Sequence, residues 1–277
     1  MPEDAGHHVV RLENHPGFPV PNGVVVRPSH LELSRLGRRA FTRQDGLDVI
    51  VTDAHFLECP ERYAANAVTI LAENLTPRSL LSMLEHLRER EATCAFTPET
   101  VGDGTMAMMA ASLGVPVSLL VTEGWSEEVL RRLLDYFLHS PALDVAIEPF
   151  FAMSQCIGAS EHRTLWDLSD EVLGTNWFID EDGRVSLSKR WANAGEYFGH
   201  MDDPVETLRE SDLWRRLGVL KRETFTEQKE CAFCKHYPFC AGYWTTSAQS
   251  EEECAMWQRL MDEVQQAFRV EVAASLG

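Results

Sequence analysis

Four cysteines have the residue type and the spacing of a metal centre. Cys231, Cys234 and Cys240 lie within ten residues, and Cys254 follows fourteen positions later. Two thiolates separated by two residues can converge on one metal from a tight turn, and four thiolates complete the shell of a zinc ion or an iron–sulfur cluster. The C-x2-C-x5-C-x13-C spacing therefore predicts a metal site made of these four residues.

The cysteine spacing alone does not decide whether the bound metal is zinc or iron. Pro238 keeps the intervening loop out of a helix, and Gly242 frees the backbone just after the third cysteine. A zinc ribbon usually presents two C-x2-C pairs. Here the fourth cysteine stands alone, which favours an iron–sulfur cluster, with zinc as the alternative.

The net charge of the chain limits the classes of molecule that it could bind. Acidic residues outnumber basic residues 43 to 25, and the formal net charge is −18. Such a surface repels phosphate backbones and anionic lipid, so we expect no nucleic-acid partner and no membrane partner. Basic peptides, basic proteins or cations are better candidates.

The same sequence predicts a cytoplasmic protein. The opening MPEDAGHHVV has acidic residues where a signal peptide carries basic ones, and no apolar run follows. No stretch reaches the roughly 18 apolar residues of a membrane-spanning helix. Thiols of a cytoplasmic protein stay reduced, so the cysteines indicate a metal site before they indicate disulfides.

Strand-like and helix-like segments alternate from residue 48 and predict an α/β fold with a parallel sheet. Thr76 and Pro77 form a typical helix start, and Gly114 a typical helix end. Predicted strands cover 47–53, 93–96, 115–124 and 143–150, and predicted helices cover 75–91, 104–114 and 126–140.

The pattern changes near residue 171. Asp182–Gly183 is a hairpin signal inside 176–188. One amphipathic helix is predicted over 203–218 and another over 250–274. We therefore predict three domains: an N-terminal arm over 1–47, a βα domain over 48–170 and a metal-binding domain over 171–277.

The segment ECAFCKHYPFCAGYW, preceded by the hairpin and by a helix ending in LWRRL, resembles the C-terminal SPASM region of radical S-adenosylmethionine enzymes. The resemblance implies that Cys231, Cys234, Cys240 and Cys254 bind one auxiliary four-iron, four-sulfur cluster. A complete SPASM region binds a second cluster, but Trp244 occupies one of its cysteine positions and the hairpin offers no cysteine. One auxiliary cluster is therefore expected to be retained and one lost.

The catalytic motif of that family is replaced in this chain. Where the family has C-x3-C-x2-C after its first strand, the sequence HFLECPERY places His55, Cys59 and Arg62. Arg62 keeps its proton and binds no metal. Gly102–Gly104 is at most a displaced remnant of the family's glycine-rich turn. The resemblance thus implies a truncated partial (β/α) barrel followed by a SPASM-like hairpin, helix and four-cysteine segment, and we expect S-adenosylmethionine not to be used.

The predicted function is that of an accessory SPASM-like subunit. It would support peptide or protein maturation by docking a substrate peptide or a catalytic partner, with a cluster that is mainly structural. Lys235 and His236 are placed to tune the cluster if it carries electrons.

Two alternatives stay open. One is a redox-active iron–sulfur enzyme with a site at the carboxyl ends of the strands, where function collects in such folds. The other is a zinc-stapled binding protein. Cys94 and Cys156 are expected to be small buried residues. The residues of a strand-end site would be His55, Glu99, Glu123 and Glu148.

Overall fold

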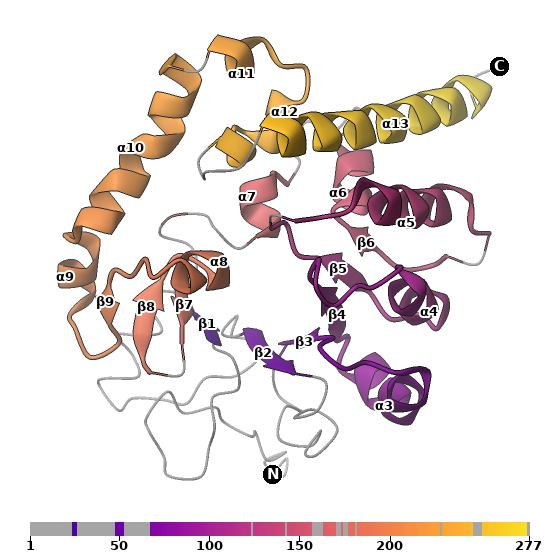
Figure 1. The fold of residues 1–277 in the computed structure, drawn as a ribbon, viewed down its shortest axis with the longest axis horizontal. Coiled ribbons are helices and arrows are strands. Elements are labelled where there is room, and N and C mark those ends of the chain that lie inside the picture. Colours follow the sequence, from indigo (N-terminus) through magenta and orange to yellow (C-terminus); the bar gives the residue numbers. More distant parts are fainter. Residues whose placement is uncertain are drawn as a thin grey trace, which may run out of the picture. The chain divides into compact units, whose positions relative to one another are not determined.

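The computed structural model describes eleven stretches of the chain (Figure 1). His55, Cys59, Arg62 and Glu123, which were singled out in the sequence, lie outside them. The described residues are 24–26, 48–52, 67–122, 124–141, 143–156, 163–169, 173, 177–180, 182–227, 229–245 and 251–275.

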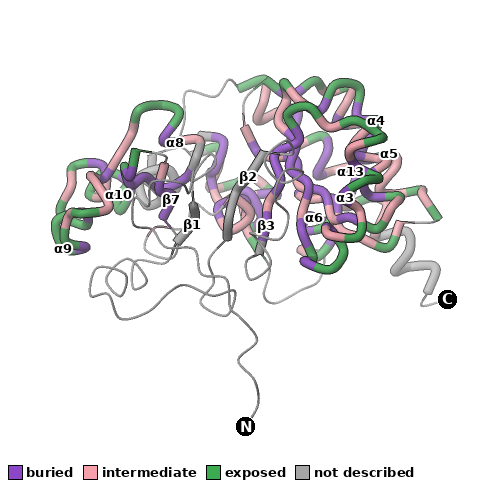
Figure 2. Tube along the Cα trace, turned by 90° about the horizontal axis from the view of Figure 1, so that it is seen from below, coloured by how far each residue is buried: buried purple, intermediate pink, exposed green. Residues whose placement is uncertain are grey.

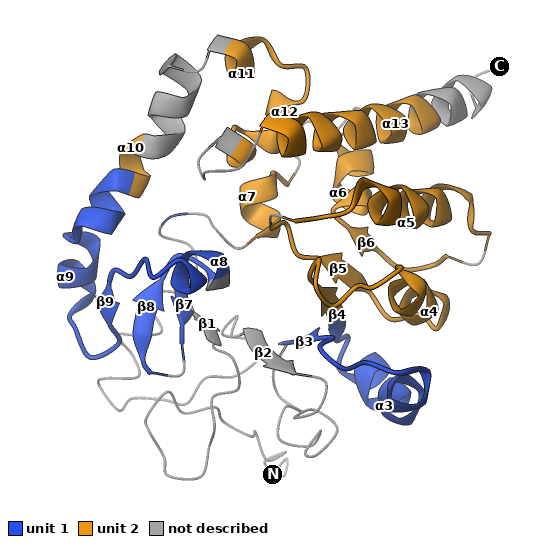
Figure 3. Cartoon of the chain, in the orientation of Figure 1, with its two compact units in different colours: residues 1–93, 170–216 blue, residues 94–169, 217–277 orange. Residues whose placement is uncertain are grey.

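The chain divides into two compact units, and each combines two stretches that are distant in sequence (Figure 3). Unit 1 takes Met1–Thr93 and Asp170–Arg216, and unit 2 takes Cys94–Ser169 and Leu217–Gly277. Each unit draws residues from both sides of position 170, where the sequence analysis puts a domain boundary. The three-domain division stays a prediction.

Unit 2 contains parallel strands in the order β6-β5-β4, where β4 is Thr93–Phe96, β5 is Val117–Leu119 and β6 is Ile147–Glu148. Val117 lies opposite both Cys94 and Ile147 in the two ladders. These strands confirm the predicted parallel pairing. β4 covers the predicted segment 93–96, whereas β5 and β6 are shorter than the predicted segments 115–124 and 143–150. Soon after β6, the chain turns into the helix α6 (Phe150–Gln155).

Helices α4 (Thr105–Ser112) and α5 (Glu127–His139) connect these strands and confirm the predicted helices. α4 starts after Gly104, whose φ of 84° suits glycine, and a Cβ there would lie 3.2 Å from Leu133. α5 buries Leu130, Leu133 and Leu134. Ser126 precedes α5 as predicted, but its side chain makes no capping hydrogen bond; the acidic first turn complements the helix dipole instead.

The C-terminal stretch of unit 2 is helical. Its longest helix, α13, lies alongside α5 and α6 (Figure 1). It buries Trp257, Leu260 and Val264, which the spacing of three and four places on one face. Figure 2 shows how buried and exposed residues are distributed along the described part of the chain. This stretch contains α11 (Lys229–Phe233), α12 (Tyr237–Cys240), the 3-10 helix η3 (Tyr243–Thr245) and α13 (Glu251–Ser275), whereas α7 (Leu165–Leu168) belongs to the earlier stretch of unit 2.

Unit 1 contains strands in the order β3-β2-β1-β7-β8-β9. β2 and β3 are parallel, and the remaining neighbours within unit 1 are antiparallel. The sequence analysis missed β3 and β9. The strands are β1 (Val24–Val26), β2 (Asp48–Thr52), β3 (Ala67–Leu71), β7 (Trp177–Ile179), β8 (Arg184–Ser186) and β9 (Gly199–His200).

The predicted hairpin is confirmed: β7 and β8 pair antiparallel on either side of Gly183, whose φ is 78°. The Asp180 carboxylate accepts the backbone N–H groups of Asp182 and Arg184 and so closes the turn. The unit 1 helices are α3 (Pro77–Glu89), α8 (Lys189–Asn193), α9 (Val205–Arg209) and the start of α10 (Asp212–Glu227).

The single helix predicted over 203–218 is wrong, because the chain forms α9 and α10 with a break between them. The Ser211 hydroxyl accepts the backbone N–H of Trp214 at 3.2 Å. This bond satisfies a donor at the start of a new helix, as an N-cap does. The start of α3 is as predicted, since Thr76 forms a capping box with Ser79 and Pro77 is the first helical residue.

Candidate metal centre

The four cysteines of the predicted metal site, called the thiol cluster below, lie in or next to three helices of unit 2. Cys231 lies in α11, Cys234 follows that helix, Cys240 ends α12 and Cys254 lies in the first turns of α13. All four are free thiols. The backbone N–H of Cys234 donates to the carbonyl of Cys231 at 3.2 Å, which closes the tight turn expected of the C-x2-C pair. The expectation that Pro238 keeps the segment between Cys234 and Cys240 out of a helix is wrong, because Pro238 lies in the first turn of α12, where a proline needs no intrahelical N–H bond.

The chain after Cys240 turns its backbone donors toward the Cys240 sulfur. Ala241 and Gly242 both have left-handed backbone conformations, with φ values of 48° and 74°. The backbone N–H groups of Gly242, Tyr243 and Trp244 then donate to Cys240. Successive N–H groups that point at one atom make an anion-binding concavity, so this turn favours a thiolate at Cys240.

Gln258 connects two other members of the thiol cluster. It lies four residues after Cys254 in α13, and its amide nitrogen Nε2 is 3.5 Å from the Cys254 sulfur and 3.8 Å from the Cys234 sulfur. The amide thereby joins α13 to the turn that follows α11. The sequence analysis missed Gln258, although its i+4 spacing from a cysteine on a helix could have indicated it.

Burial and the neighbouring thiols both affect the pKa values of Cys240 and Cys254. Burial raises the pKa of Cys240 to about 11; the three backbone donors lower it, and Cys254 raises it. Burial also raises the pKa of Cys254, and the charges of Cys231 and Cys234 raise it further. The raised pKa values of Cys240 and Cys254 favour their protonated forms, so metal binding would have to displace those protons.

Two basic residues of the cysteine segment are tied to α13 through Asp262. Lys235 Nζ lies 2.5 Å and His236 Nε2 lies 2.9 Å from Asp262 Oδ1. His236 is 3% exposed, and its Nδ1 has no hydrogen-bond partner among the residues that the structure describes. Burial lowers the pKa of His236. This contact holds the α12 turn against the helix that carries Cys254.

The cysteine segment is also fixed to the carboxyl end of β5. The Tyr243 hydroxyl donates to the carbonyl of Val121 at 3.1 Å, and the backbone N–H of Gly124 donates to Glu253 at 2.8 Å. Trp125 Nε1 donates to the carbonyl of Leu120 at 2.9 Å. The chain just after β5 is therefore hydrogen-bonded to Tyr243, which follows the third cysteine, and to Glu253, which precedes the fourth.

A buried aromatic group packs behind the cluster. Trp244 stacks on Trp257 with ring centroids 5.1 Å apart and an interplanar angle of 17°. Tyr243 meets Trp244 and Trp166 edge to face, at 5.3 Å in both cases. All four rings are at most 2% exposed. Trp244, which the resemblance places at a lost cysteine position, is thus a core residue.

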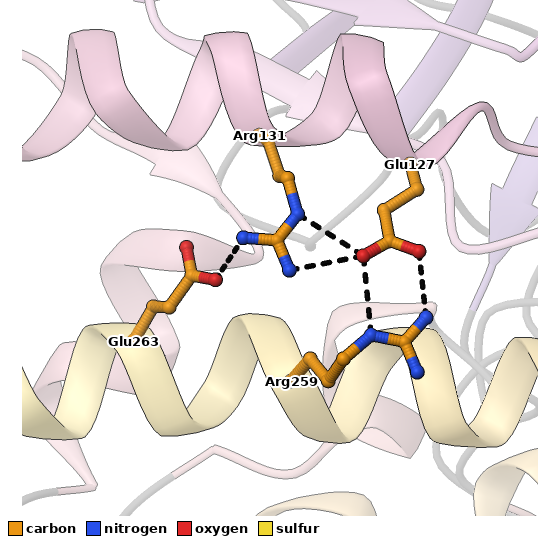
Figure 4. Close-up of polar contacts among 4 residues, drawn as sticks. All are labelled: Glu127, Arg131, Arg259 and Glu263. Atoms are coloured by element: carbon orange, nitrogen blue, oxygen red, sulfur yellow. Dashed lines mark hydrogen bonds and ion pairs between the residues drawn. The ribbon is translucent and has the colours of Figure 1, made fainter.

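Four charged residues set the position of α13 against α5 (Figure 4). Arg259 Nη2 is 2.6 Å from Glu127 Oε2, and Arg131 Nη2 is 2.9 Å from Glu127 Oε1. Arg131 also pairs with Glu263. The Arg259 and Arg131 guanidinium groups lower the pKa of Glu127 to about 2. Because Cys254 and Gln258 lie on α13, this network also positions the cluster.

The residues present fit a thiolate-bound metal in their chemistry. Within the described ranges, no set of three or more His, Cys, Asp or Glu side chains has an arrangement that holds a metal ion as it stands. The donor set nevertheless consists of four free sulfurs that interact with one another, and hydrogen-bond donors are directed at three of them. Closing on a metal would draw these sulfurs nearer together.

Of the four residues proposed for a strand-end site, the structure describes Glu99 and Glu148. Glu99 is exposed, whereas the Glu148 side chain is 19% exposed and lies at the end of β6. The Glu148 carboxylate accepts the backbone N–H of Ala152 at 3.0 Å and is 3.6 Å from Arg163. Burial raises the pKa of Glu148.

The remaining residues that the sequence singled out lie in or next to helices and strands. Cys94 is fully buried in β4, as predicted. Cys156 is only half-buried, and burial raises its pKa to about 11. Gly102–Gly104 forms the turn before α4, where Asp103 accepts the backbone N–H and the hydroxyl of Thr105 and pairs with Arg132.

Comparisons with known proteins add no family: the chain matches no protein-family model, no curated protein and no solved structure. Among the described helices, none combines the length and the apolar character needed to cross a membrane.

Proposed function

We propose that this chain is an accessory protein built around one four-cysteine metal centre, and that it supports the maturation of a peptide or protein. The observation that carries the proposal is that four free cysteines belong to one compact unit and that the Gln258 amide contacts two of them, Cys234 and Cys254. The sequence resemblance to SPASM regions favours a four-iron, four-sulfur cluster, with zinc as the alternative metal. The truncated barrel and the SPASM identity of the hairpin belong to this proposal.

The cysteines would hold the centre, and the neighbouring donors would stabilise its thiolates. A bound cluster supplies a rigid cross-link and the capacity for one-electron transfer. In this chain, Cys240 receives its donors from the backbone, and Cys234 and Cys254 receive theirs from Gln258. The centre would thereby cross-link the two short helices α11 and α12 to the long helix α13.

The packing at β5 supports an accessory role over catalysis. Open α/β sheets place ligands at the carboxyl ends of their strands. In unit 2, the carbonyl of Val121 just beyond β5 is bonded to Tyr243, and Leu120 to Trp125. The cysteine segment therefore occupies part of the place where a substrate would lie.

The surface beside the cluster supports docking of a basic partner. Phe233 is 89% exposed and lies one residue before Cys234. Glu230, three residues before Phe233, is also exposed, as are Glu251 and Glu252 just before Cys254, and Lys235 is neutralised by its pair with Asp262. An exposed aromatic side chain with acidic neighbours fits an apolar pocket bordered by basic residues, which we assign to a catalytic partner or a peptide substrate.

The first experiment is metal analysis after anaerobic purification of the wild type, Cys234→Ala and Cys156→Ala. The proposal predicts about four irons and four sulfides per chain. Cys234→Ala loses this metal, and Cys156→Ala keeps it. One zinc without iron would establish the zinc-stapled alternative, and a wild type without bound metal would overturn both.

The enzyme alternative has one observation in its favour, the partly buried Glu148 beside Cys156 at the end of β6. Its test is the combined replacement of His55, Glu99, Glu123 and Glu148 by alanine, and unchanged biological activity of that variant would overturn the enzyme alternative. The expectation that S-adenosylmethionine is not used has a separate test. Anaerobic protein reduced by dithionite should form no 5′-deoxyadenosine above a control without protein, and formation of that product would overturn the expectation.

A further inference from the structure

We propose that Gln258 is a positioning residue that holds the sulfurs of Cys234 and Cys254 for one common metal ion. The inference rests on the proposed function, because it assigns a role at the same centre. It goes beyond that function by naming a residue that is not a metal ligand and that a cysteine pattern does not contain.

The geometry begins with the position of Gln258 on α13. Residues four apart lie on the same helix face, so Gln258 lies beside Cys254, one turn further along. Its Nε2 is 3.5 Å from the Cys254 sulfur, and the same nitrogen is 3.8 Å from the Cys234 sulfur, which belongs to the segment after α11. One side chain thus contacts two cysteines that are twenty positions apart in sequence.

The chemistry of the amide matches this double contact. A primary amide nitrogen carries two hydrogens, so it can donate to two acceptors at once. Two thiolates side by side repel each other, because both carry a negative charge. A neutral donor between two sulfurs reduces that repulsion and adds no charge. Gln258 would therefore order the pair before the metal arrives and stabilise both thiolates afterwards.

The other donors of the centre cannot replace it. The backbone donors of Gly242, Tyr243 and Trp244 are directed at Cys240. Lys235 and His236 are engaged with Asp262. For Cys234 and Cys254, the side-chain donor that the structure shows in the described ranges is the Gln258 amide.

The test uses cobalt(II) alone as the probe, added anaerobically to the full-length, metal-free protein. Cobalt bound by thiolates has sulfur-to-metal charge-transfer absorption, and its growth gives the dissociation constant. Gln258→Leu removes the donor, and Gln258→Glu keeps the shape but replaces the amide with a carboxylate. Gln266→Leu is the matched control, because Gln266 lies two turns further along α13 and is exposed.

Loss of a hydrogen-bond partner of a metal ligand typically weakens metal binding 10- to 100-fold. We expect a weakening of about that size for Gln258→Leu, a larger one for Gln258→Glu, and a shifted charge-transfer band in both variants. Gln266→Leu is expected to match the wild type. A merely structural role for Gln258 would leave the band position unchanged.

The outcomes separate the two proposals. A wild type with no charge-transfer band overturns the metal centre, and the role of Gln258 with it. A wild-type band with unchanged affinity and band position in Gln258→Glu overturns the role of Gln258 alone. That variant is isosteric, so it keeps the inference testable if Gln258→Leu fails to fold.

Discussion

The Tyr243 hydroxyl donates to the carbonyl oxygen of Val121 across 3.1 Å, between residues 122 positions apart in the chain. Tyr243 is fully buried and follows Cys240 by three residues. This bond fixes the segment that holds the third cysteine to the strand end of β5. Metal binding and the folding of unit 2 are therefore expected to be coupled.

Tyr243→Phe is predicted to destabilise the protein by about 1–2 kcal/mol, because the Val121 carbonyl loses its partner in a buried place. Denaturant unfolding of the metal-free protein measures this change. Tyr136→Phe is the control, since its hydroxyl lies 2.7 Å from the Ser112 hydroxyl at an exposed site. Equal effects of the two substitutions would contradict the anchoring role of Tyr243.

Glu148→Gln is predicted to stabilise the protein at neutral pH. Burial raises the pKa of Glu148 above its ordinary value of 4.5, so the folded state binds this proton more tightly than the unfolded state does. The wild type therefore gains stability as the pH falls through the folded pKa, and the glutamine variant does not. The advantage of Glu148→Gln should disappear below about pH 4.5.

Thermal unfolding of Glu148→Gln between pH 4 and pH 8 provides the measurement. Glu99→Gln is the control, because Glu99 is an exposed carboxylate at another strand end. A variant less stable than the wild type at pH 7 would show that the contact with Arg163 outweighs the cost of burial.

Glu127→Gln is predicted to lower the melting temperature at pH 7 and low salt. The hydrogen bonds from Arg259 and Arg131 lower the pKa of Glu127 to about 2, so its stabilisation is present above the ordinary value of 4.5 and is lost as the pH falls toward 2. The difference should also shrink in about 1 M salt, where the Debye length is roughly 3 Å.

The matched control for Glu127 is Glu128→Gln, which removes an exposed carboxylate from the same first turn of α5. It loses the same favourable interaction with the helix dipole but no pair with α13. Equal melting temperatures for the two variants would mean that the network of Figure 4 adds no stability.

Removal of the metal is predicted to destabilise unit 2. A metal that binds the folded state at 100 times its dissociation constant adds about 2.7 kcal/mol of stability. Incubation with a chelator should therefore lower the unfolding midpoint of the wild type. Cys254→Ser should have a lower unfolding midpoint from the outset, and the chelator should change it little. Equal changes in midpoint for the two proteins would argue against a metal held by Cys254.

The sequence predicted those parts of the fold that depend on neighbouring residues. Thr76 and Pro77 determine the start of α3, and Gly183 determines a turn. The break before α10 escaped notice because Ser211 lies inside a continuous helical periodicity, and only its hydrogen bond to Trp214 shows it as a cap. β9 escaped because two residues carry no pattern.

The candidate metal centre likewise has features that the sequence predicts and features that it does not. Its four cysteines can be recognised from their type and spacing. The contacts that hold them join residues far apart in sequence, such as Gln258 with Cys234, Tyr243 with Val121 and Glu253 with Gly124. Because these partners are set by packing and not by spacing, the sequence alone predicts the ligands but not their support.

The divided make-up of unit 2 has a consequence for how the protein is synthesised. A ribosome makes Cys94–Ser169 well before Leu217–Gly277, at about 5–20 residues per second. Until the later stretch emerges, the earlier one lacks Trp257, Leu260 and the other residues that bury its apolar surface. The four cysteines of the thiol cluster belong to that later stretch. The metal would therefore be inserted only after Leu217–Gly277 has been synthesised and has packed against Cys94–Ser169.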